Sequence, residues 1–415
     1  MPIDVTGVEN HPLMKDPYVT KILELSKDKS LYEKSSSALE QLRLQLFRDS
    51  LDYFSRNNSE YVVMLENLDI NPKSVEFEDL VDIAVTSDFF RGDGQKKYII
   101  GDVPLGGPSF QSSGTSGKDP VRIYRSPIDI LVQRDVNTNG AESVLGHELN
   151  GGEAMFLAAP ELKDFTSFVA FVEDAFSIRD IDIKYGMKVV EDPNARTIWE
   201  KLRPDTKTIS SFYKSKQEPK YLMTAPVGIY RTIKQFEDAS PFLKYIIYGL
   251  YLRVPPIKLG KGGAIFTGGG IKGSDIPSME KIMEMSKEKI VAKDENNRTI
   301  PAPFIDCLSH TENLAVLFSK PNSLVKMPHP LSHVFLVDKE TFKPIEGYGK
   351  GVVGIFNPFT TTYLEAFYPG DMMERVPDDN YYGSGFLFKR RLTKEEGWDL
   401  ERACGGGLEE AYKKK

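Results

Sequence analysis

A short loop rich in serine, threonine and glycine is the strongest sign of chemistry in the sequence. It runs over Ser112–Lys118 as Ser-Ser-Gly-Thr-Ser-Gly-Lys. Hydroxyl groups, open backbone N–H groups and one ammonium group can all donate hydrogen bonds to phosphate oxygens. The two glycines stand too close together for a Walker A loop. The pattern therefore predicts a different phosphate-binding loop. A plain solvent-exposed linker is the alternative, which the β-like run from Val121 disfavours.

A second glycine-rich segment spans Gly262–Gly273. Gly268, Gly270 and Gly273 satisfy the G-x-G-x-x-G pattern of dinucleotide-binding proteins. The signals that start the next helix, however, begin at Ser274, whereas the dinucleotide fingerprint places its third glycine inside the helix. A turn on which a flat base or nucleoside lies fits the segment equally well. A nicotinamide-dependent oxidoreductase therefore remains an alternative, which an absorbance change with the reduced cofactor would reveal.

Two acidic positions follow β-like or turn-like segments. Ser309-His-Thr-Glu312 comes directly after the apolar run Phe304–Leu308. This order places the Glu312 carboxylate at the end of a β-like run, where it can help to hold Mg²⁺ on bound phosphates. Asp371 ends the sequence Tyr-Pro-Gly-Asp, which on its own is an ordinary turn.

The chain contains two cysteines, Cys307 and Cys404. Their wide separation, without a C-x-x-C pair, does not support a zinc knuckle, a disulfide framework or a thioredoxin-like redox pair. Arg402 can favour the thiolate form of Cys404, and the three glycines that follow this cysteine give the backbone freedom. Cys307 lies in an apolar run and is expected to be a small buried hydrophobic residue. Cys404 is therefore the candidate nucleophile.

The elements that must position these residues indicate an α/β protein. Residues 17–95 carry helical periodicity. After them, β-like runs such as Tyr98–Ile100 and His333–Val337 occur among helical stretches and turns. Alternation of short strands with helices is typical of an α/β fold, and the crowded runs after residue 300 predict a β-rich segment.

The same patterns suggest a division of the chain into three parts. We expect a helical lead-in over residues 1–96 and an α/β body over residues 97–371. A short, mobile C-terminal lobe over residues 372–415 would then carry Cys404. A mobile segment can bring a thiol to a product that is formed elsewhere in the molecule.

Composition and charge narrow the classes of partner. The 415 residues are 40% apolar, which is enough to build a core without metal or disulfide support. The net charge of −7 argues against binding to nucleic acid or to an anionic membrane surface. The sequence shows neither a leader-like start nor an apolar stretch of about 18 residues. We therefore expect a cytoplasmic protein with no membrane span and no nucleic acid partner.

Taken in chain order, four motifs resemble those of the adenylate-forming enzymes, the superfamily of acyl-CoA synthetases, luciferases and peptide-synthetase adenylation domains. These motifs are Ser113–Lys118, Thr267–Gly270, Ser309–Glu312 and Pro369–Asp371. The form Ser-Ser-Gly-Thr-Ser-Gly, the glycine triplet followed by Ile-Lys, and a cysteine near the end look most like the acyl-protein synthetases of the LuxE type. Those proteins are the fatty-acid-activating component of bacterial luminescence reductase complexes. The resemblance covers roughly residues 97–405.

The resemblance implies an α/β adenylate-forming fold and a two-step reaction that uses ATP and Mg²⁺. A carboxylic acid, which is a fatty acid in the LuxE-type enzymes, attacks the α-phosphate of ATP and gives acyl-AMP and pyrophosphate. The acyl group then passes to a cysteine of the enzyme. An acyl reductase of the LuxC type would be the partner that receives it.

The resemblance also assigns roles to single residues. It places a first set around the β- and γ-phosphates: Ser112, Ser113, Gly114, Thr115, Ser116, Gly117 and Lys118. It places a second set along the adenine and the acyl group: Gly268, Gly269 and Gly270. Thr311 and Glu312 would contact the α-phosphate and Mg²⁺, with His310 beside them. Asp371 would bind the ribose, Arg391 the ribose or a phosphate, and Cys404 would accept the acyl group.

Other functions remain open. A phenylacetate-type CoA ligase or another adenylyltransferase of the superfamily would share the first step, although the short C-terminal segment favours transfer to protein over transfer to CoA. A non-catalytic nucleotide-binding scaffold of a reductase complex would keep the motifs without the reaction. ATP–pyrophosphate exchange separates the scaffold from the enzymes, and product analysis with and without CoA separates the ligases.

Overall fold

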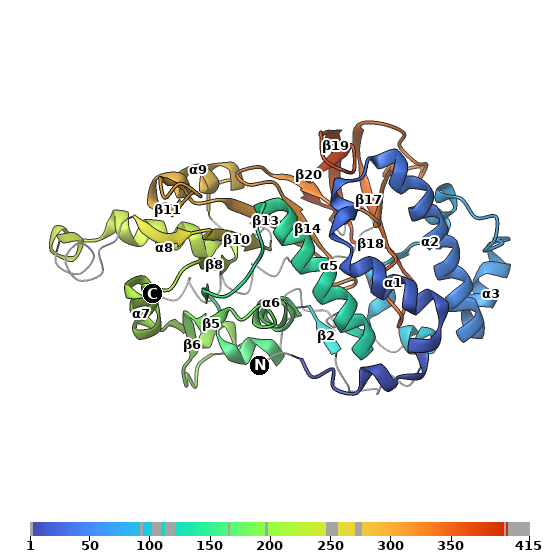
Figure 1. Ribbon diagram of the computed structural model, residues 1–415, viewed down its shortest axis with the longest axis horizontal. Coiled ribbons are helices and arrows are strands. Elements are labelled where there is room, and N and C mark those ends of the chain that lie inside the picture. The colour runs from blue at the N-terminus through green and yellow to red at the C-terminus, as the bar shows by residue number, and fades with distance from the viewer. Residues whose placement is uncertain are drawn as a thin grey trace.

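The N-terminal segment folds into helices that begin at side-chain caps. The computed structural model describes residues 3–91, 94–101, 109–112, 121–164, 167–195, 198–245, 256–269, 276–393 and 396. Asp16 caps α1 (Pro17–Lys27) and Ser35 caps α2 (Ser36–Asn57), each by accepting a backbone N–H bond. The helices α3 (Ser59–Asn67) and α4 (Leu80–Ile83) follow. In Figure 1 the blue helices α1 and α2 lie at the right, near the labels of strands β17 (Gly349–Asn357) and β18 (Glu365–Tyr368).

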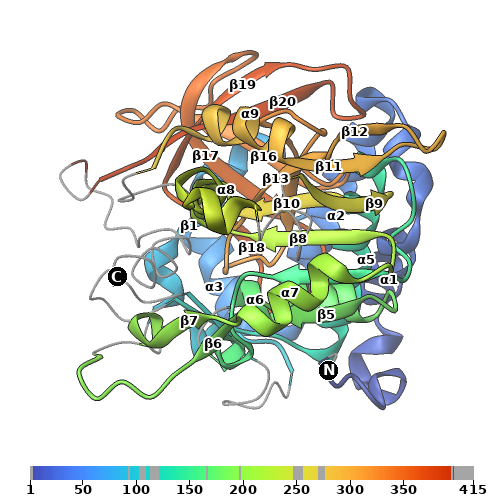
Figure 2. The ribbon, with the colours of Figure 1, turned by 90° about the vertical axis from the view of Figure 1, so that its left-hand side faces the viewer.

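A large mixed sheet forms the centre of the protein. Its parallel part has five neighbouring strands in the following order: β5 (Asp182–Tyr185), β4 (Glu153–Phe156), β8 (Lys220–Thr224), β10 (Ala264–Gly268) and β13 (Phe304–Ser309). Labels β5, β8, β10 and β13 follow one another upward in Figure 2. The carboxyl ends of these strands therefore share one edge of the sheet, which is where open α/β sheets bind ligands.

The antiparallel part continues the same sheet from β13. Its strands follow in this order: β14 (Val316–Ser319), β15 (Val325–Met327), β20 (Ser384–Arg391), β19 (Asp371–Pro377), β17 (Gly349–Asn357) and β18 (Glu365–Tyr368). The short β1 (Val85–Thr86) runs parallel to β18, and β16 (His333–Val337) pairs with β17. The sheet thus extends past Asp371, the last residue of the proposed body. The division into body and lobe stays a prediction.

Side chains that alternate along the parallel strands build two cores on opposite faces. Phe156, Phe266 and Ile305 belong to one core, which also contains side chains of α5 (Pro127–Leu145) and α6 (Ser167–Ser177). Residues next to them in sequence point to the other core, against α7 (Thr206–Lys214), α8 (Pro226–Asp238) and α9 (Met279–Lys289). This is the layered arrangement of an α/β fold.

Helix α5 has clear start and stop signals in the sequence. The Ser126 hydroxyl accepts a hydrogen bond from the Asp129 N–H, and Pro127 occupies the first turn. Gly146 ends the helix with φ of 73°, a conformation that favours glycine. The start of α5 is thereby fixed directly after β3 (Arg122–Tyr124).

Three small sheets complete the structure. They are the hairpin of β2 (Ser109–Gln111) and β3 (Arg122–Tyr124), the pair β6 (Met187–Val189) and β7 (Leu202–Pro204), and the sheet of β9 (Ile257–Lys261), β11 (Ile290–Lys293) and β12 (Thr299–Pro301). Among the described residues, no helix combines the length and the apolar character that a bilayer crossing requires.

Candidate functional site

Two of the sequence motifs meet at the carboxyl edge of the parallel strands. Gly268, the last residue of β10, is the register partner of Cys307 in β13. Ser309 ends β13, so that His310, Thr311 and Glu312 follow at the same edge. Gly269 has φ of 82°, which permits the sharp turn that leaves β10.

Asp371, His310 and Arg391 are in direct contact. Asp371 opens β19 and is the register partner of Arg391, which ends β20. The Arg391 Nε donates to Asp371 Oδ1 at 2.7 Å, and His310 Nε2 lies 3.0 Å from Asp371 Oδ2. Burial alone would raise the pKa of Asp371, but the Arg391 guanidinium and the His310 hydrogen bond more than offset it and hold that pKa well below its usual range. Asp371 is therefore an anchored carboxylate.

A buried arginine holds the backbone at Glu312. Arg125 follows β3 and has no exposed surface. Its Nη2 donates to the backbone carbonyl of Glu312, and its Nη1 forms an ion pair with Glu365 and lies 3.6 Å from Asp129 Oδ2. A fully buried guanidinium needs such anionic and carbonyl partners because it cannot lose its charge.

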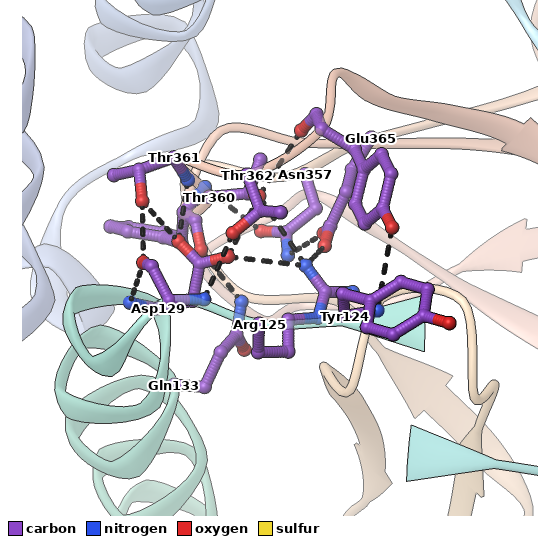
Figure 3. Close-up of polar contacts among 12 residues, drawn as sticks. Tyr124, Arg125, Asp129, Gln133, Asn357, Thr360, Thr361, Thr362 and Glu365 are labelled. Atoms are coloured by element: carbon purple, nitrogen blue, oxygen red, sulfur yellow. Dashed lines mark hydrogen bonds and ion pairs between the residues drawn. The ribbon is translucent and has the colours of Figure 1, made fainter. Parts of the chain in front are cut away.

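The same cluster ties the start of α5 to the loop between β17 and β18, as Figure 3 shows. Asp129 accepts hydrogen bonds from the backbone N–H and the hydroxyl of Thr361, both at 2.6 Å. Gln133 donates to the carbonyl of Phe359 at 2.7 Å, and Asn357 donates to Glu365 at 2.6 Å. Glu312 is thus attached through Arg125 to a rigid, mostly buried network.

The sequence analysis missed Arg125. A local signal was present, because a helix N-terminus carries a partial positive charge and disfavours a cation beside it. Arg125 stands directly before the Ser126-Pro127 start of α5, so a nearby anion could have been inferred. The identity of that anion could not, because Glu365 lies far along the chain.

The base of the predicted phosphate loop is closed by two hydrogen bonds. The Ser112 N–H donates to the Val121 carbonyl at 3.0 Å, and the Val121 N–H donates to the Ser112 hydroxyl at 3.1 Å. The hairpin of β2 and β3 therefore carries the loop, and the chain passes from β3 straight to Arg125. Several predicted site residues lie outside the described residues: Ser113, Gly114, Thr115, Ser116, Gly117, Lys118, Gly270 and Cys404.

The described residues suit Mg²⁺ held together with substrate phosphates. They contain no cluster of three or more His, Cys, Asp or Glu side chains that could cage a metal ion. Mg²⁺ is usually bound by one or two carboxylates plus phosphates, and it keeps several waters. Glu312 can supply one such carboxylate, since its side chain has no hydrogen bond or ion pair within the described part of the chain.

An apolar pocket opens beside the same edge of the sheet. Gly268 and Ser309 line it together with aromatic side chains of α6 and β10. Cys307 also borders it, and burial raises the pKa of the Cys307 thiol well above its usual range. Cys307 is therefore a poor nucleophile near neutral pH, as expected of a small buried residue.

We expect the Glu365 carboxyl to make the stability of the protein depend on pH. Burial raises its pKa to about 8, a shift that Arg125 opposes and Asp129 increases. The folded state therefore keeps a proton that the unfolded chain releases near pH 4.5. The stabilising contribution is complete below that pH and is lost as the pH rises through about 8. Urea unfolding of wild type and Glu365→Gln between those values should show that the free energy of unfolding of wild type falls, relative to that of Glu365→Gln, as the pH rises; a difference that does not change with pH would contradict this.

Comparison with known proteins gives the fold. No protein-family model matches the sequence, and no curated protein matches it. A solved structure of 2-hydroxyisobutyryl-CoA ligase in the postadenylation state, in complex with R3-HIB-AMP, is similar at a TM-score of 0.59 and 12% identity, over 88% of this chain and 70% of that one. An open conformation of that ligase with 2-HIB-AMP and CoA has a TM-score of 0.56 at 12% identity, over 87% of this chain and 77% of that one. The predicted α/β fold class is confirmed: the chain has the mixed α/β fold of the adenylate-forming enzymes.

Proposed function

We propose that this protein is an ATP-dependent ligase that activates a carboxylic acid as acyl-AMP and releases pyrophosphate. The observation that carries the proposal is the fixed position of Glu312. Its backbone is held by buried Arg125, and it lies two residues after His310, which contacts Asp371. Gly268 of β10 and an apolar pocket lie at the same edge of the sheet. These groups suit phosphates, a ribose and an acyl group, which supports the proposal.

In the first step, an oxygen of the acid attacks the α-phosphorus of ATP, and the bond from that phosphorus to pyrophosphate breaks. Lys118 and the hydroxyls of Thr115 and Ser116 would bind the leaving phosphates. Glu312 would hold Mg²⁺, whose charge offsets the negative charge of the phosphates. Charge stabilisation and alignment of this kind account for most of the catalysis in phosphate chemistry.

The ribose would lie against Asp371. The two carboxylate oxygens of Asp371 already accept hydrogen bonds from His310 and Arg391, but a carboxylate has about four acceptor positions. Because Arg391 keeps Asp371 ionised, the carboxylate remains an acceptor for ribose hydroxyls across the physiological pH range. Arg391 would itself face the ribose or a phosphate.

In the second step, the thiolate of Cys404 would attack the acyl carbon, form a thioester and release AMP. The thioester would then pass to an acyl reductase partner in the cytoplasm, where thiols stay reduced. Transfer to CoA is the second candidate. It is supported by the similarity in fold to a ligase that was solved with 2-HIB-AMP and CoA.

Replacement of Cys404 by Ala is expected to abolish self-acylation and to leave acyl-AMP formation intact. The thiol acts only after the adenylate has formed, so the first step does not need it. Purified wild type, Cys404→Ala and the matched control Cys307→Ala would be incubated with ATP, Mg²⁺ and radiolabelled acids and run on a denaturing gel. Label should persist in wild type and in Cys307→Ala and disappear in Cys404→Ala.

Other outcomes separate the alternatives. Acyl-AMP without labelled protein, together with an acyl-CoA product when CoA is added, would move the assignment to a CoA ligase. Absence of ATP–pyrophosphate exchange with every acid would contradict the proposed function and favour a nucleotide-binding scaffold.

A further inference from the structure

The apolar pocket lies on one face of the sheet, at the carboxyl edge of the parallel strands. Phe266 of β10 and its register partner Ile305 of β13 belong to the same core, so Cys307, two residues further on, points to that face as well. Phe318 of β14 is the register partner of Cys307 and completes this wall. Gly268 links the pocket to the glycine-rich turn. A group in the pocket would therefore stand beside the place where the acyl–phosphate bond is proposed to form.

The polar residues of the pocket wall leave its interior apolar. Asn137 accepts a hydrogen bond from the Val316 N–H at 2.9 Å, and the Thr138 hydroxyl donates to a carbonyl of its own helix at 2.7 Å. Thr267 alternates with its neighbour in β10 and points to the opposite face of the sheet. Ser309 ends β13 and lies at the mouth, beside the reacting end of the acid. A tail inside the pocket is therefore apolar, because a polar group there would lose its hydrogen bonds to water.

The size of the pocket limits that tail. Its volume is about 50 Å³. An apolar protein cavity that binds benzene measures about 150 Å³. Within the walls that the described residues form, the pocket is thus too small for a phenyl ring or for a long alkyl chain. The tail of propanoate, butanoate or 2-methylpropanoate matches it better.

An interior glycine of α5 determines where one wall of the pocket stands. Gly140 is buried in the helix, where glycine is less favourable than alanine. A Cβ atom at this position would lie 3.0 Å from two atoms of the Phe318 ring, closer than such contacts normally are. The helix cannot easily move away, because Asn137, one turn earlier, bonds the backbone of the strand segment at Leu314 and Val316. In Figure 1 the labels of α5 and β14 accordingly lie side by side. Glycine thus lets the ring lie against the helix and leaves the pocket its width.

We propose that the substrate is a short-chain aliphatic acid and that Phe318, seated on Gly140, sets the upper size limit of its tail. This inference rests on the proposed function and specifies its substrate class. It differs from the fatty acid that the resemblance implies. Phe318 determines specificity by forming the wall of the pocket. Gly140 is a positioning residue, which acts through the Phe318 ring.

The first test compares acids of graded size in ATP–pyrophosphate exchange with wild type. The acids are acetate, propanoate, butanoate, 2-methylpropanoate, octanoate, benzoate and hexadecanoate. The best of the short acids should exceed octanoate, benzoate and hexadecanoate by about tenfold or more in kcat/KM, because even one misfitting methylene group in an apolar pocket has an effect of this order.

Variants at the two positions should shift the size limit in opposite directions. Phe318→Ala enlarges the pocket, so the preference for short acids over octanoate and benzoate should fall by about tenfold, and Phe318→Leu should act in the same direction. Gly140→Ala should push the ring into the free space of the pocket and lower kcat/KM for butanoate relative to acetate. The double variant Gly140→Ala/Phe318→Leu gives the new methyl group room and should accept butanoate again.

Phe304 provides a matched control. It opens β13, is fully buried, and belongs to the core on the opposite face of the sheet. Phe304→Leu should lose stability much as Phe318→Leu does, yet keep the size preference of wild type. Thermal unfolding of each variant would verify that the proteins are folded.

The outcomes distinguish this inference from the proposed function. If hexadecanoate, octanoate or benzoate is the best substrate of wild type, or if the Phe318 and Gly140 variants keep its size preference, the inference is wrong while acid activation stands. Should Phe318→Ala fail to fold, Phe318→Leu and Gly140→Ala still decide. If no acid of any class supports exchange, the proposed function itself has failed.

Discussion

Replacement of Glu312 by Gln is expected to lower ATP–pyrophosphate exchange by about a hundredfold or more, without loss of stability. Groups that stabilise developing charge typically contribute effects of this size. Glu312 is 7% exposed, and its carboxylate has no ionic partner in the described part of the chain, so that neutralising it removes a buried charge and no ion pair. The Arg125 bond to the backbone carbonyl remains in the variant, and the segment keeps its position.

The measurement has two parts. Exchange would be followed at increasing Mg²⁺ concentrations, where a ligand role predicts a raised Mg²⁺ requirement for Glu312→Gln. Urea unfolding should give a free energy equal to that of wild type or slightly higher. Glu161→Gln, at an exposed position outside the site, serves as the control and should behave as wild type. Full exchange activity in Glu312→Gln at low Mg²⁺ would show that this carboxylate holds neither metal nor phosphate.

Elements with strong local signals were predictable from the sequence. The run His333–Val337 was expected to be β-like and is β16. The apolar run Phe304–Leu308 was expected to precede a site at a strand end, and it forms β13 up to Ser309. In these segments apolar residues either alternate with polar ones or form a short run, and turn residues stand on both sides. A sheet can therefore bury the segments as strands.

The prediction of one β-like run is wrong, and the reason is physical. Tyr98–Ile100 contains aromatic and β-branched residues, yet the chain forms a 3-10 helix over Gly94–Tyr98. The Tyr98 ring packs edge-on against Tyr61 of α3, with ring centroids 5.3 Å apart. Aromatic residues favour strands because strands bury them, and here a contact with a helix partly buries the ring instead. Tertiary packing therefore overrides the local preference.

Contacts between segments that lie far apart along the chain could not be predicted from the sequence. The motif residues Asp371 and His310 could be named, but their direct bond depends on the order of β13, β14, β15, β20 and β19 in one sheet. The Arg125 network likewise needs the loop after β17 to lie against the start of α5. Charged side chains indicate that a partner exists, and only the topology determines which one it is.

Replacement of Arg125 by Met is expected to destabilise the protein by about 3–5 kcal/mol, as found when one partner of a buried ion pair is removed. The change would leave Asp129 buried without its nearby cation and would remove the group that opposes the rise in the pKa of Glu365. It would also remove the donor to the Glu312 carbonyl, so exchange should fall in the protein that remains folded. Arg125→Lys would keep the charge, but one ammonium group cannot replace a planar guanidinium that reaches several partners at once.

Two further variants separate the structural role of Arg125 from its positioning role. In Arg125→Met/Asp129→Asn the buried carboxylate that has lost its nearby cation is neutralised, so part of the lost stability should return while exchange stays low. Arg134→Met is the matched control: Arg134 is a buried arginine of α5, the helix that starts just after Arg125, and it is paired with Asp174 and has no bond to the backbone at Glu312. This control should lose stability by a similar amount and keep its exchange activity per folded molecule. If both exchange and stability return in the double variant, Arg125 serves folding alone. A positioning role predicts that exchange stays low, because the Glu312 carbonyl still lacks its donor in that variant.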